Sequence, residues 1–237
     1  MDVSKGRRAE TILAPMKRRS QLGKRLFDLA LTLPALVLLS PLITVAAVLT
    51  AVGVGSPILF RQQRPGLHGR PFILIKFRTM TDERDANGTL KPDAARMRPI
   101  GRFLRVSSLD ELPQLWNVIR GEMSLVGPRP LLMEYLPYYT AEQNRRHSVP
   151  PGITGWAQIN GRNLAAFSAR LKLDIWYVDH WSLWLDFKIL ACTVIKVVRS
   201  CGVKLAQPLE EVDDVGLHPE TRKGIHRYRT PGVTDTT

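Results

Sequence analysis

The chain has 237 residues, 44% of them apolar, so it is long enough to bury one core of medium size. It carries 34 Lys and Arg against 21 Asp and Glu, a formal net charge of +13, which favours nucleic acid, anionic lipid or phosphorylated substrates without choosing among them. Its two cysteines, Cys192 and Cys201, exclude a framework of several disulfides and fit a reducing compartment.

A long apolar stretch lies near the N-terminus. Between Arg25 and Arg61 the only charged residue is Asp28, and residues 29–54 are almost wholly apolar. About 20 apolar residues suffice to cross a bilayer, so this stretch can enter a membrane. It fits a cleaved signal peptide poorly, because the apolar part of such a peptide has only about 7–15 residues.

The charges on both sides of the stretch indicate its topology. Residues 1–25 contain eight Lys or Arg and two acids, and residues 56–80 contain five Lys or Arg and no acid. Positively charged flanks favour the cytoplasm, so both ends are predicted to lie there. A helix that enters the membrane and bends back at Ser40-Pro41 satisfies this, since the serine hydroxyl can satisfy a carbonyl freed by the proline. A straight, kinked transmembrane helix is the alternative.

A β-hairpin is predicted after the membrane stretch. Residues 57–62 and 71–79 have strand character, and residues 64–69, Arg-Pro-Gly-Leu-His-Gly, are typical of a turn. Because side chains alternate along a strand, Lys76 and Arg78 share one face and form a small cationic patch near the membrane exit. The alternative is a solvated pair on an edge strand.

The remaining chain is predicted to be mostly helical. Residues 82–98 form a polar loop and 156–160 a short strand, and helices are expected at 131–146, 164–178 and 183–199. The last helix is amphipathic, which suits either a membrane interface or packing against a core. Four aromatic residues cluster before it or at its start: Trp176, Tyr177, Trp181 and Trp184.

Asp110 and Glu111 are the centre of the candidate chemistry. Ser108 and Glu111 have the spacing of a capping box, so the two acids can simply begin a helix. Arg102 and Arg105, however, precede them at helical spacing, and a helix N-terminus beside a carboxylate suits phosphate and Mg²⁺. Adjacent helical side chains point about 100° apart, so we expect the two acids to have different roles.

Arg129 is the second candidate. Pro128 and Pro130 fix its backbone, and a held guanidinium suits bidentate phosphate binding; the alternative is a stiff turn with an exposed arginine. The sequence contains no Gly-rich phosphate loop, Walker-type lysine or G-x-S-x-G elbow. Three scattered histidines make a zinc cluster a poor interpretation: His68, His147 and His180.

Six short blocks follow one another in a specific order: Lys24-Arg25-Leu26-Phe27-Asp28; Ser40-Pro41; Lys76-Phe77-Arg78-Thr79-Met80; Ser108-Leu109-Asp110-Glu111-Leu112-Pro113-Gln114; Met123-Ser124-Leu125-Val126-Gly127-Pro128-Arg129-Pro130; and Pro151-Gly152-Ile153-Thr154-Gly155-Trp156-Ala157-Gln158. Together they resemble the bacterial sugar transferase family, the monotopic phosphoglycosyl transferases, over residues 24–207. The chain looks like the small form of that family, little more than its catalytic module.

The residues and the resemblance together predict an α+β membrane-associated fold. It has a re-entrant membrane helix, a small β-hairpin and several helices, including interfacial amphipathic helices. The expected divisions are a basic N-terminal tail (1–25), the re-entrant membrane helix (26–56), a cytosolic catalytic domain (57–206) and a polar C-terminal tail (207–237). The expected location is the bacterial cytoplasmic (inner) membrane, with the catalytic domain on the cytoplasmic face.

The resemblance implies transfer of a sugar-1-phosphate from a UDP-sugar to undecaprenyl phosphate or another polyprenyl phosphate, with release of UMP, as the first membrane step of glycoconjugate or polysaccharide assembly. Asp110 is then the nucleophile that forms a phosphosugar-aspartyl intermediate and the residue at which Mg²⁺ binds, and Glu111 completes the acidic pair. Arg105, Arg129 and Lys76 become the candidates for binding phosphate.

Pro150 departs from the family, which usually has a basic residue there, and this puts a phosphate contact at that position in doubt. Two other interpretations are open. An inactive relative that binds the lipid carrier is disfavoured by the intact acids. A basic membrane scaffold or nucleic-acid-binding protein lacks a supporting helix-turn-helix, RNP or zinc-finger pattern. The expected partners are therefore a UDP-sugar, polyprenyl phosphate and inner-membrane lipids, with no nucleic acid; the sugar, the glycan and the oligomeric state are not predicted.

Overall fold

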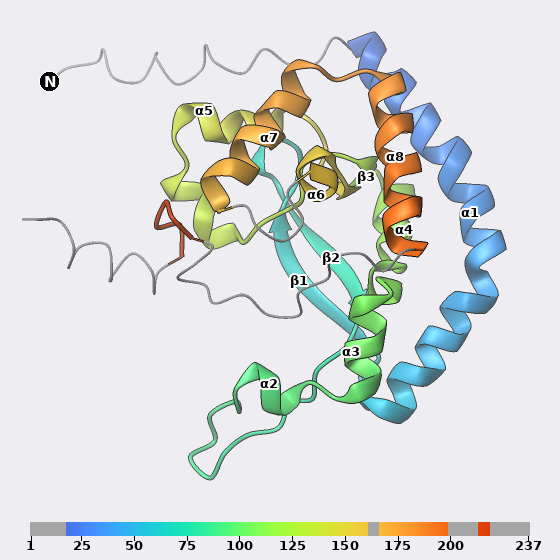
Figure 1. The fold of residues 1–237 in the computed structure, drawn as a ribbon, viewed down its shortest axis with the longest axis vertical. Helices are drawn as coiled ribbons and strands as arrows, with labels where there is room; N and C mark the ends of the chain where they lie inside the picture. Colours follow the sequence, from blue (N-terminus) through green and yellow to red (C-terminus); the bar gives the residue numbers. More distant parts are fainter. Residues whose placement is uncertain (1–17, 161–165, 199–212, 219–237) are drawn as a thin grey trace, which may run out of the picture.

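The computed structural model describes residues 18–160, 166–198 and 213–218. One long helix runs along an edge of the molecule, and short helices and two small sheets pack on its inner side (Figure 1). The mixed α and β composition is as predicted. The helices are α1 (Arg18–Gly53), η2 (Leu67–Gly69), α2 (Asp93–Arg96), α3 (Pro99–Val106), η3 (Leu109–Glu111), α4 (Gln114–Arg120), η4 (Met133–Tyr138), α5 (Ala141–Asn144), η5 (Arg145–Ser148), α6 (Trp156–Asn160), α7 (Phe167–Asp179) and α8 (Leu183–Val198). The strands are β1 (Leu59–Pro65), β2 (Pro71–Phe77), β3 (Ser124–Val126) and β4 (Gly152–Thr154).

Helix α1 is the apolar element that the sequence predicts. Among the described residues it is the one helix long and apolar enough to cross a membrane, with a mean hydropathy of 2.4 over its most apolar part. It runs through Pro34 and Pro41 without interruption and is bowed in Figure 1. Pro41 leaves the carbonyl of Val37 without its helical donor, and the Ser40 hydroxyl donates to that carbonyl at 2.8 Å. The compensation expected at Ser40-Pro41 is therefore confirmed.

Both halves of α1 contact the same domain. In the first half, the Arg25 guanidinium donates to the Ile119 carbonyl at 2.5 Å, and the Asp28 carboxylate accepts from the Ser124 hydroxyl at 3.0 Å. In the second half, Ala46 is fully buried in a cluster with side chains of β2 and α3. The two ends of the helix are thus held on one body of protein.

The predicted hairpin is present. Strands β1 and β2 pair antiparallel, with Leu59 opposite Phe77 and Pro65 opposite Pro71. The paired region of β1 extends to Pro65, beyond the predicted strand end at residue 62. Consequently Arg64, expected in the turn, belongs to the strand and shares a face with Lys76.

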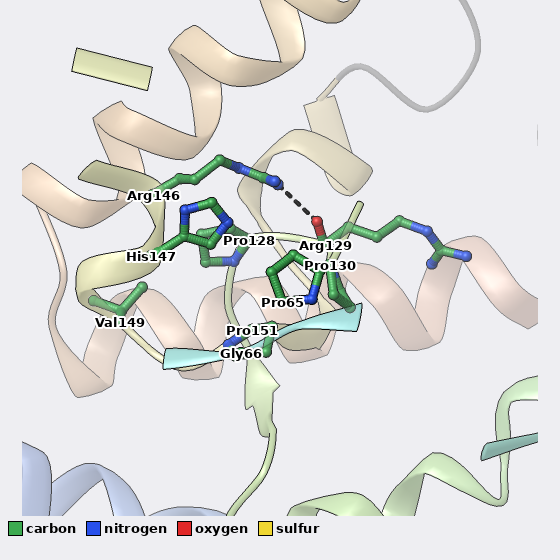
Figure 2. A pocket seen from close by; sticks show the side chains of 9 residues that line it. All are labelled: Pro65, Gly66, Pro128, Arg129, Pro130, Arg146, His147, Val149 and Pro151. Atoms are coloured by element: carbon green, nitrogen blue, oxygen red, sulfur yellow. Dashed lines mark hydrogen bonds between the residues drawn. The ribbon is translucent and has the colours of Figure 1, made fainter. Parts of the chain in front are cut away.

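A second small sheet supports the turn that carries Arg129. Strand β3 pairs parallel with β4, and a Cβ on Gly152 would lie 2.0 Å from the backbone nitrogen of Gly127, so only glycine permits this approach. The Arg129 carbonyl accepts a hydrogen bond of 2.6 Å from Nη2 of Arg146 (Figure 2). Arg146 in turn forms a buried ion pair with Asp174 of α7 at 2.6 Å. The backbone of the turn is thus fixed from two sides.

Several predicted elements are wrong. The single helix expected at 131–146 is divided into η4, α5 and η5, because Pro137 lies inside it and Thr140 starts a new helix through a capping box with Gln143. Residues 156–160 form helix α6 rather than a strand, and α6 packs against α7 and α8. The polar loop 82–98 contains the short helix α2.

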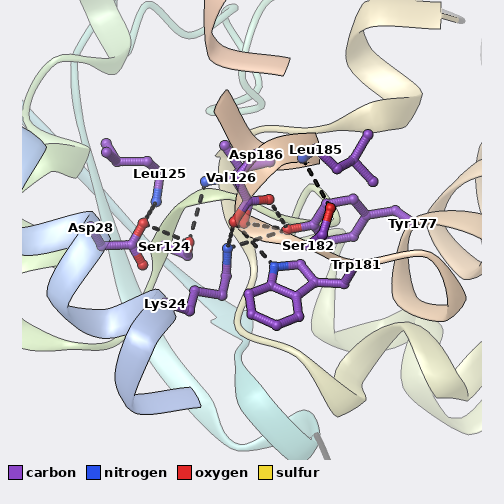
Figure 3. A network of polar contacts seen from close by, with 10 residues as sticks. All are labelled: Lys24, Asp28, Ser124, Leu125, Val126, Tyr177, Trp181, Ser182, Leu185 and Asp186. Atoms are coloured by element: carbon purple, nitrogen blue, oxygen red, sulfur yellow. Dashed lines mark hydrogen bonds and ion pairs between the residues drawn. The ribbon is translucent and has the colours of Figure 1, made fainter. Parts of the chain in front are cut away.

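A buried polar network joins α1 to α7 and α8 (Figure 3). The Lys24 ammonium lies 2.7 Å from the Asp186 carboxylate, and the two side chains are only 3% and 0% exposed. The same carboxylate accepts from the Tyr177 hydroxyl at 2.6 Å and from the Trp181 indole at 3.1 Å. Burial of the two charges is therefore compensated by pairing and by neutral donors.

Helix α8 does not divide simply into an outer polar face and an inner apolar face. Asp186 and Ile189 are fully buried, whereas Trp184, Phe187 and Val194 are 73%, 53% and 62% exposed. The Asp186 carboxylate lies in the interior, where it binds Lys24. The exposed apolar side chains are a feature expected of an interfacial helix.

Residues 213–218 pack against α7. Leu217 is 1% exposed in a cluster with Tyr135, Phe167 and Leu171. The Asp213 carboxylate accepts from the backbone N–H of Leu217 at 2.9 Å and so fixes this short turn. The rest of the tail predicted at 207–237 lies outside the described residues.

Asp186→Asn tests the buried network. Removing the negative charge leaves the Lys24 ammonium buried without its counter-ion, so we expect the free energy of unfolding to fall by about 3 kcal/mol. Denaturant unfolding in detergent micelles measures the change, with Asp85→Asn in the exposed loop as the matched control. Equal stabilities of Asp186→Asn and the wild-type protein would contradict this role.

Candidate active site

The two acids lie on a tight turn between α3 and α4. Helix α3 ends at Val106, and Ser108 adopts a left-handed backbone with φ 59°, which redirects the chain into the turn η3. The Ser108 side chain makes no capping hydrogen bond, so the predicted capping box with Glu111 is wrong. The turn places Asp110 and Glu111 beside the hairpin instead of at the start of a long helix.

Glu111 is held by two cations. Its Oε1 atom accepts from Nζ of Lys76 and from Nη2 of Arg129, each at 2.7 Å. Burial by itself would raise the pKa of Glu111, but the charges and hydrogen bonds of Arg129 and Lys76 outweigh burial and hold that pKa below its ordinary value. Glu111 is therefore an ionised anchor for both cations.

Asp110 has a different environment from its neighbour. Its side chain is 8% exposed, and burial, reinforced by the negative charge of Glu111, raises the pKa of Asp110 to about 6, although Lys76, Arg129 and Arg105 oppose the shift. Five carboxylates of the described residues line the neighbouring cavity: Asp82, Asp93, Asp110, Glu111 and Asp174. Four of them form ion pairs, and Asp110 alone forms none.

The basic residues of the hairpin and of α3 take separate positions. Lys76 faces Glu111, and burial, only partly offset by that carboxylate, lowers the pKa of Lys76. Arg78 shares the cavity wall but pairs with Asp82 at 2.9 Å. Arg105 donates to the Thr79 hydroxyl at 2.8 Å and also lines the cavity. Arg102, expected on the same face, is exposed and does not line the cavity.

Arg129 extends from its fixed turn toward the acids. Figure 2 shows its side chain pointing away from the small pocket between Pro128 and Pro151. That pocket has a volume of only about 10 Å³, room for about one water molecule. The adjacent charge of Glu111 raises the pKa of Arg129, so its guanidinium is charged at any physiological pH. The turn predicted around Arg129 thus delivers a fixed cation to the site.

A cavity of about 1040 Å³ brings the predicted residues together. Lys76, Arg105, Asp110, Glu111 and Arg129 all line it. Its apolar wall includes residues of α1 and α8: Leu39, Leu42, Val194 and Val197. Ser40 and Pro41 are not part of the lining, although their neighbours in α1 are. The cavity therefore joins a charged region to an apolar region beside the membrane helix.

The charged residues of the cavity that the sequence analysis missed include Arg64, Arg146, Arg170 and Asp174. Arg64 was assigned to a turn, but the alternation that selected Lys76 also selects Arg64 once the hairpin register is known. The other three come from η5 and α7, whose approach to the cavity depends on packing between distant segments. No local sequence signal identifies them.

The residues present can be tested against a divalent metal. Among the described residues there is no group of three or more His, Cys, Asp or Glu side chains that could hold a metal. Glu111 already binds two cations, which leaves the Asp110 carboxylate as an oxygen ligand. One carboxylate completed by phosphate oxygens and water is an ordinary environment for Mg²⁺. The site therefore fits Mg²⁺ only together with a phosphorylated ligand.

Comparison with known proteins identifies the family. The family model described as bacterial sugar transferase matches residues 19–200. The chain belongs to the bacterial sugar transferase family. The resemblance stated from the six sequence blocks is thereby confirmed.

Three relatives illustrate the range of this family. The uncharacterized sugar transferase EpsL of Bacillus subtilis is 57% identical over 76% of this chain and 90% of that protein. A UDP-glucose:undecaprenyl-phosphate glucose-1-phosphate transferase of Xanthomonas campestris is 42% identical over 74% of this chain and 39% of its own length. A UDP-galactose-lipid carrier transferase of Erwinia amylovora is 40% identical over 78% of this chain and 42% of its own length. This chain thus spans about two fifths of the last two.

Pro150, where the bacterial sugar transferase family usually has a basic residue, lies at the approach to β4. A Cβ on Gly127 would lie 2.3 Å from the Pro150 carbonyl oxygen, so the two backbones are in close contact. Pro150 does not line the large cavity. The cationic charge of the cavity therefore comes from other positions in this member of the family.

We expect the free energy of unfolding of Asp110→Asn at pH 7.5 to exceed that of the wild-type protein by about 3 kcal/mol. Folding raises the pKa of the Asp110 carboxyl by about two units, and this rise corresponds to that free energy. The unfolded chain loses the Asp110 proton near pH 3.8 and the folded protein near pH 6, so the wild-type protein loses stability as the pH rises through this window. Denaturant unfolding at pH 4 and pH 7.5 measures both values. The difference in the free energy of unfolding should shrink toward zero at pH 4. A difference of equal size at both pH values would contradict a raised pKa of Asp110.

Proposed function

We propose that this protein transfers a sugar-1-phosphate from a UDP-sugar to polyprenyl phosphate and releases UMP. The observation that carries the proposal is that Asp110 alone, among the carboxylates described in the cavity wall, forms no ion pair, in a cavity lined by nine Lys or Arg side chains. Relatives whose names state this reaction with undecaprenyl phosphate support it. The names of the relatives include both glucose and galactose, so similarity does not identify the donor sugar of this chain.

Asp110 acts as the nucleophile in a two-step reaction. Its carboxylate oxygen attacks the sugar-bearing phosphorus, the bond from that phosphorus to the oxygen of UMP breaks, and UMP leaves with the bonding electrons. An oxygen of polyprenyl phosphate then attacks the same phosphorus and releases the Asp110 carboxylate. Dividing the transfer through a covalent intermediate replaces one difficult step by two easier ones.

The cations around Asp110 make it feasible for its anionic carboxylate to approach the anionic diphosphate of the donor. Lys76 and Arg129 are held by Glu111 on one side of Asp110, and Arg105 is held by Thr79. Fixed positive charges stabilise the negative charge that develops on a transferring phosphoryl group. Mg²⁺, held by Asp110 together with phosphate oxygens, would add charge neutralisation. The raised pKa of Asp110 requires a pH above about 6 for the nucleophile to be ionised.

The contacts of the two halves of α1 support the proposed membrane arrangement. Both halves of the helix contact one domain, which supports a re-entrant helix bent at Ser40-Pro41, with the catalytic domain on the cytoplasmic face of the bacterial inner membrane. The exposed apolar side chains of α8 support contact of that helix with the membrane interface. Polyprenyl phosphate then reaches the cavity along its apolar wall.

UMP release tests the reaction. The purified protein in nanodiscs with Mg²⁺ is supplied with a panel of UDP-sugars, with and without undecaprenyl phosphate. We expect one or more sugars to give lipid-dependent UMP, and Asp110→Asn to lose activity by about 10³-fold or more because the nucleophile is absent. Asp85→Asn, which changes a carboxylate outside the cavity, should retain full activity.

The lipid-free reaction separates the mechanism from the reaction. A burst of UMP, stoichiometric with protein and absent in Asp110→Asn, is expected from the aspartyl intermediate. Lipid-dependent turnover without such a burst would exclude an intermediate that forms before the lipid binds. Absence of UMP release from all UDP-sugars by a folded preparation would contradict the proposed function itself.

Cysteine labelling tests the topology. Leu22→Cys and Ser56→Cys are introduced separately into a Cys192→Ala/Cys201→Ala background, and a membrane-impermeant maleimide is applied to vesicles of either orientation. A re-entrant α1 predicts that both positions react only when the cytoplasmic face is exposed. Reaction of the two positions in vesicles of opposite orientation would instead show that α1 spans the membrane.

A further inference from the structure

The cavity continues past Arg129 into a second cationic region. Arg64, from the end of β1, and Arg170, from the first turn of α7, both line it. The positive charge of Arg129 acts on both residues: burial and this charge lower the pKa of Arg64 and the pKa of Arg170. Arg64 and Arg170 thus each lie within electrostatic reach of Arg129.

Arg64 has only neutral partners within the described residues. Its Nη2 donates to the Gln62 side-chain oxygen at 2.6 Å, and its Nη1 lies 3.5 Å from the Pro130 carbonyl oxygen. Its Nε is buried and has no hydrogen-bond partner among the described atoms. A guanidinium that is largely removed from water and lacks an anion is unfavourable, and an anionic ligand with several oxygens would relieve this.

The nearby carboxylates are already engaged. Asp174 binds Arg146 at 2.6 Å, and Glu111 binds Lys76 and Arg129. Neither is recorded in an ion pair with Arg64. The charge of Glu134 acts on Arg64 without a recorded ion pair, so an anion that enters the cavity can pair with this guanidinium.

We propose that Arg64 forms a second phosphate subsite that binds the nucleotide phosphate of the donor, the one that leaves as UMP. This inference rests on the proposed function. Lys76 and Arg129 then face the sugar-bearing phosphate next to Asp110, and Arg64 takes the following phosphate. A cation at the leaving group stabilises the charge that the breaking bond delivers to it.

The position of the subsite favours the donor over the acceptor. The part of the apolar lining along which a polyprenyl chain would enter includes Leu39 and Leu42 of α1 and Val194 and Val197 of α8. Arg64 and Arg170 come from β1 and α7, and in Figure 1 α7 lies on the other side of α8 from α1. A polyprenyl phosphate that enters along α1 and α8 would thus reach the cavity beside elements other than the strand that carries Arg64, and a soluble nucleotide is the ligand that fits the second region.

Arg64→Gln tests the subsite by two routes. Calorimetry measures the Kd of UMP, and steady-state assays measure the KM of the active UDP-sugar and of undecaprenyl phosphate. We expect the Kd of UMP and the KM of the UDP-sugar to rise tenfold or more, with the KM of undecaprenyl phosphate unchanged. Arg61→Gln, an exposed arginine on the same strand, is the matched control and should leave all three values unchanged.

The outcomes separate the alternatives. A rise only in the KM of undecaprenyl phosphate would assign Arg64 to the acceptor and overturn the inference, as would no change in any value. If the wild-type protein releases UMP from none of the UDP-sugars, the proposed function is refuted. If the wild-type protein is active, the result for the Arg64 variant bears on the subsite alone. If Arg64→Gln lowers the thermal unfolding midpoint, the same measurements are made on Arg64→Lys, which keeps the charge but loses the planar guanidinium. Unchanged UMP binding in this folded variant overturns the inference.

Discussion

The pairing of one carboxylate with two cations is the interaction on which the site depends. Glu111 binds Lys76 of β2 and Arg129 of the turn after β3, so three segments distant in sequence meet at one oxygen atom. Without this anion, two partly buried cations would repel each other. With it, both are fixed beside Asp110, which is left without an ion pair among the described residues. The two adjacent acids thus have different environments because Lys76 and Arg129 pair with Glu111 and not with Asp110.

The long helix imposes the second constraint. Helix α1 runs without interruption from Arg18 to Gly53, and it is attached to one domain through Arg25 and Asp28 in its first half and through Ala46 in its second. The buried Lys24–Asp186 pair adds a connection to α8, the helix that exposes tryptophan and phenylalanine. The long apolar helix and the cavity are consequently parts of one packed structure, and both α1 and α8 contribute to the apolar lining of the cavity.

The sequence predicts those features that depend on local patterns. The apolar length of α1, the hairpin, the stiff turn around Arg129 and the cluster of candidate residues at Lys76, Arg105 and Asp110–Glu111 all follow from spacing and composition. Features that depend on long-range packing do not follow. Residues 156–160 became a helix through contacts with α7 and α8, and Ser108 turned the chain without capping a helix. Arg64 was missed because the strand extends to Pro65, three residues beyond its predicted end, and Arg146 reaches the site only through its contacts with Arg129 and Asp174.

The family match ends at residue 200, but the packed structure does not. Leu217 is buried against Phe167 and Leu171 of α7, the helix that also carries Arg170 and Asp174 into the cavity wall. One face of that helix therefore meets the substrate cavity, while the other is shielded from water by a segment beyond the matched region. A protein shortened to the family boundary would expose a strip of apolar surface on α7, and chains with such a strip tend to associate with one another. The family match in sequence and the packed structure of this molecule consequently end at two different positions.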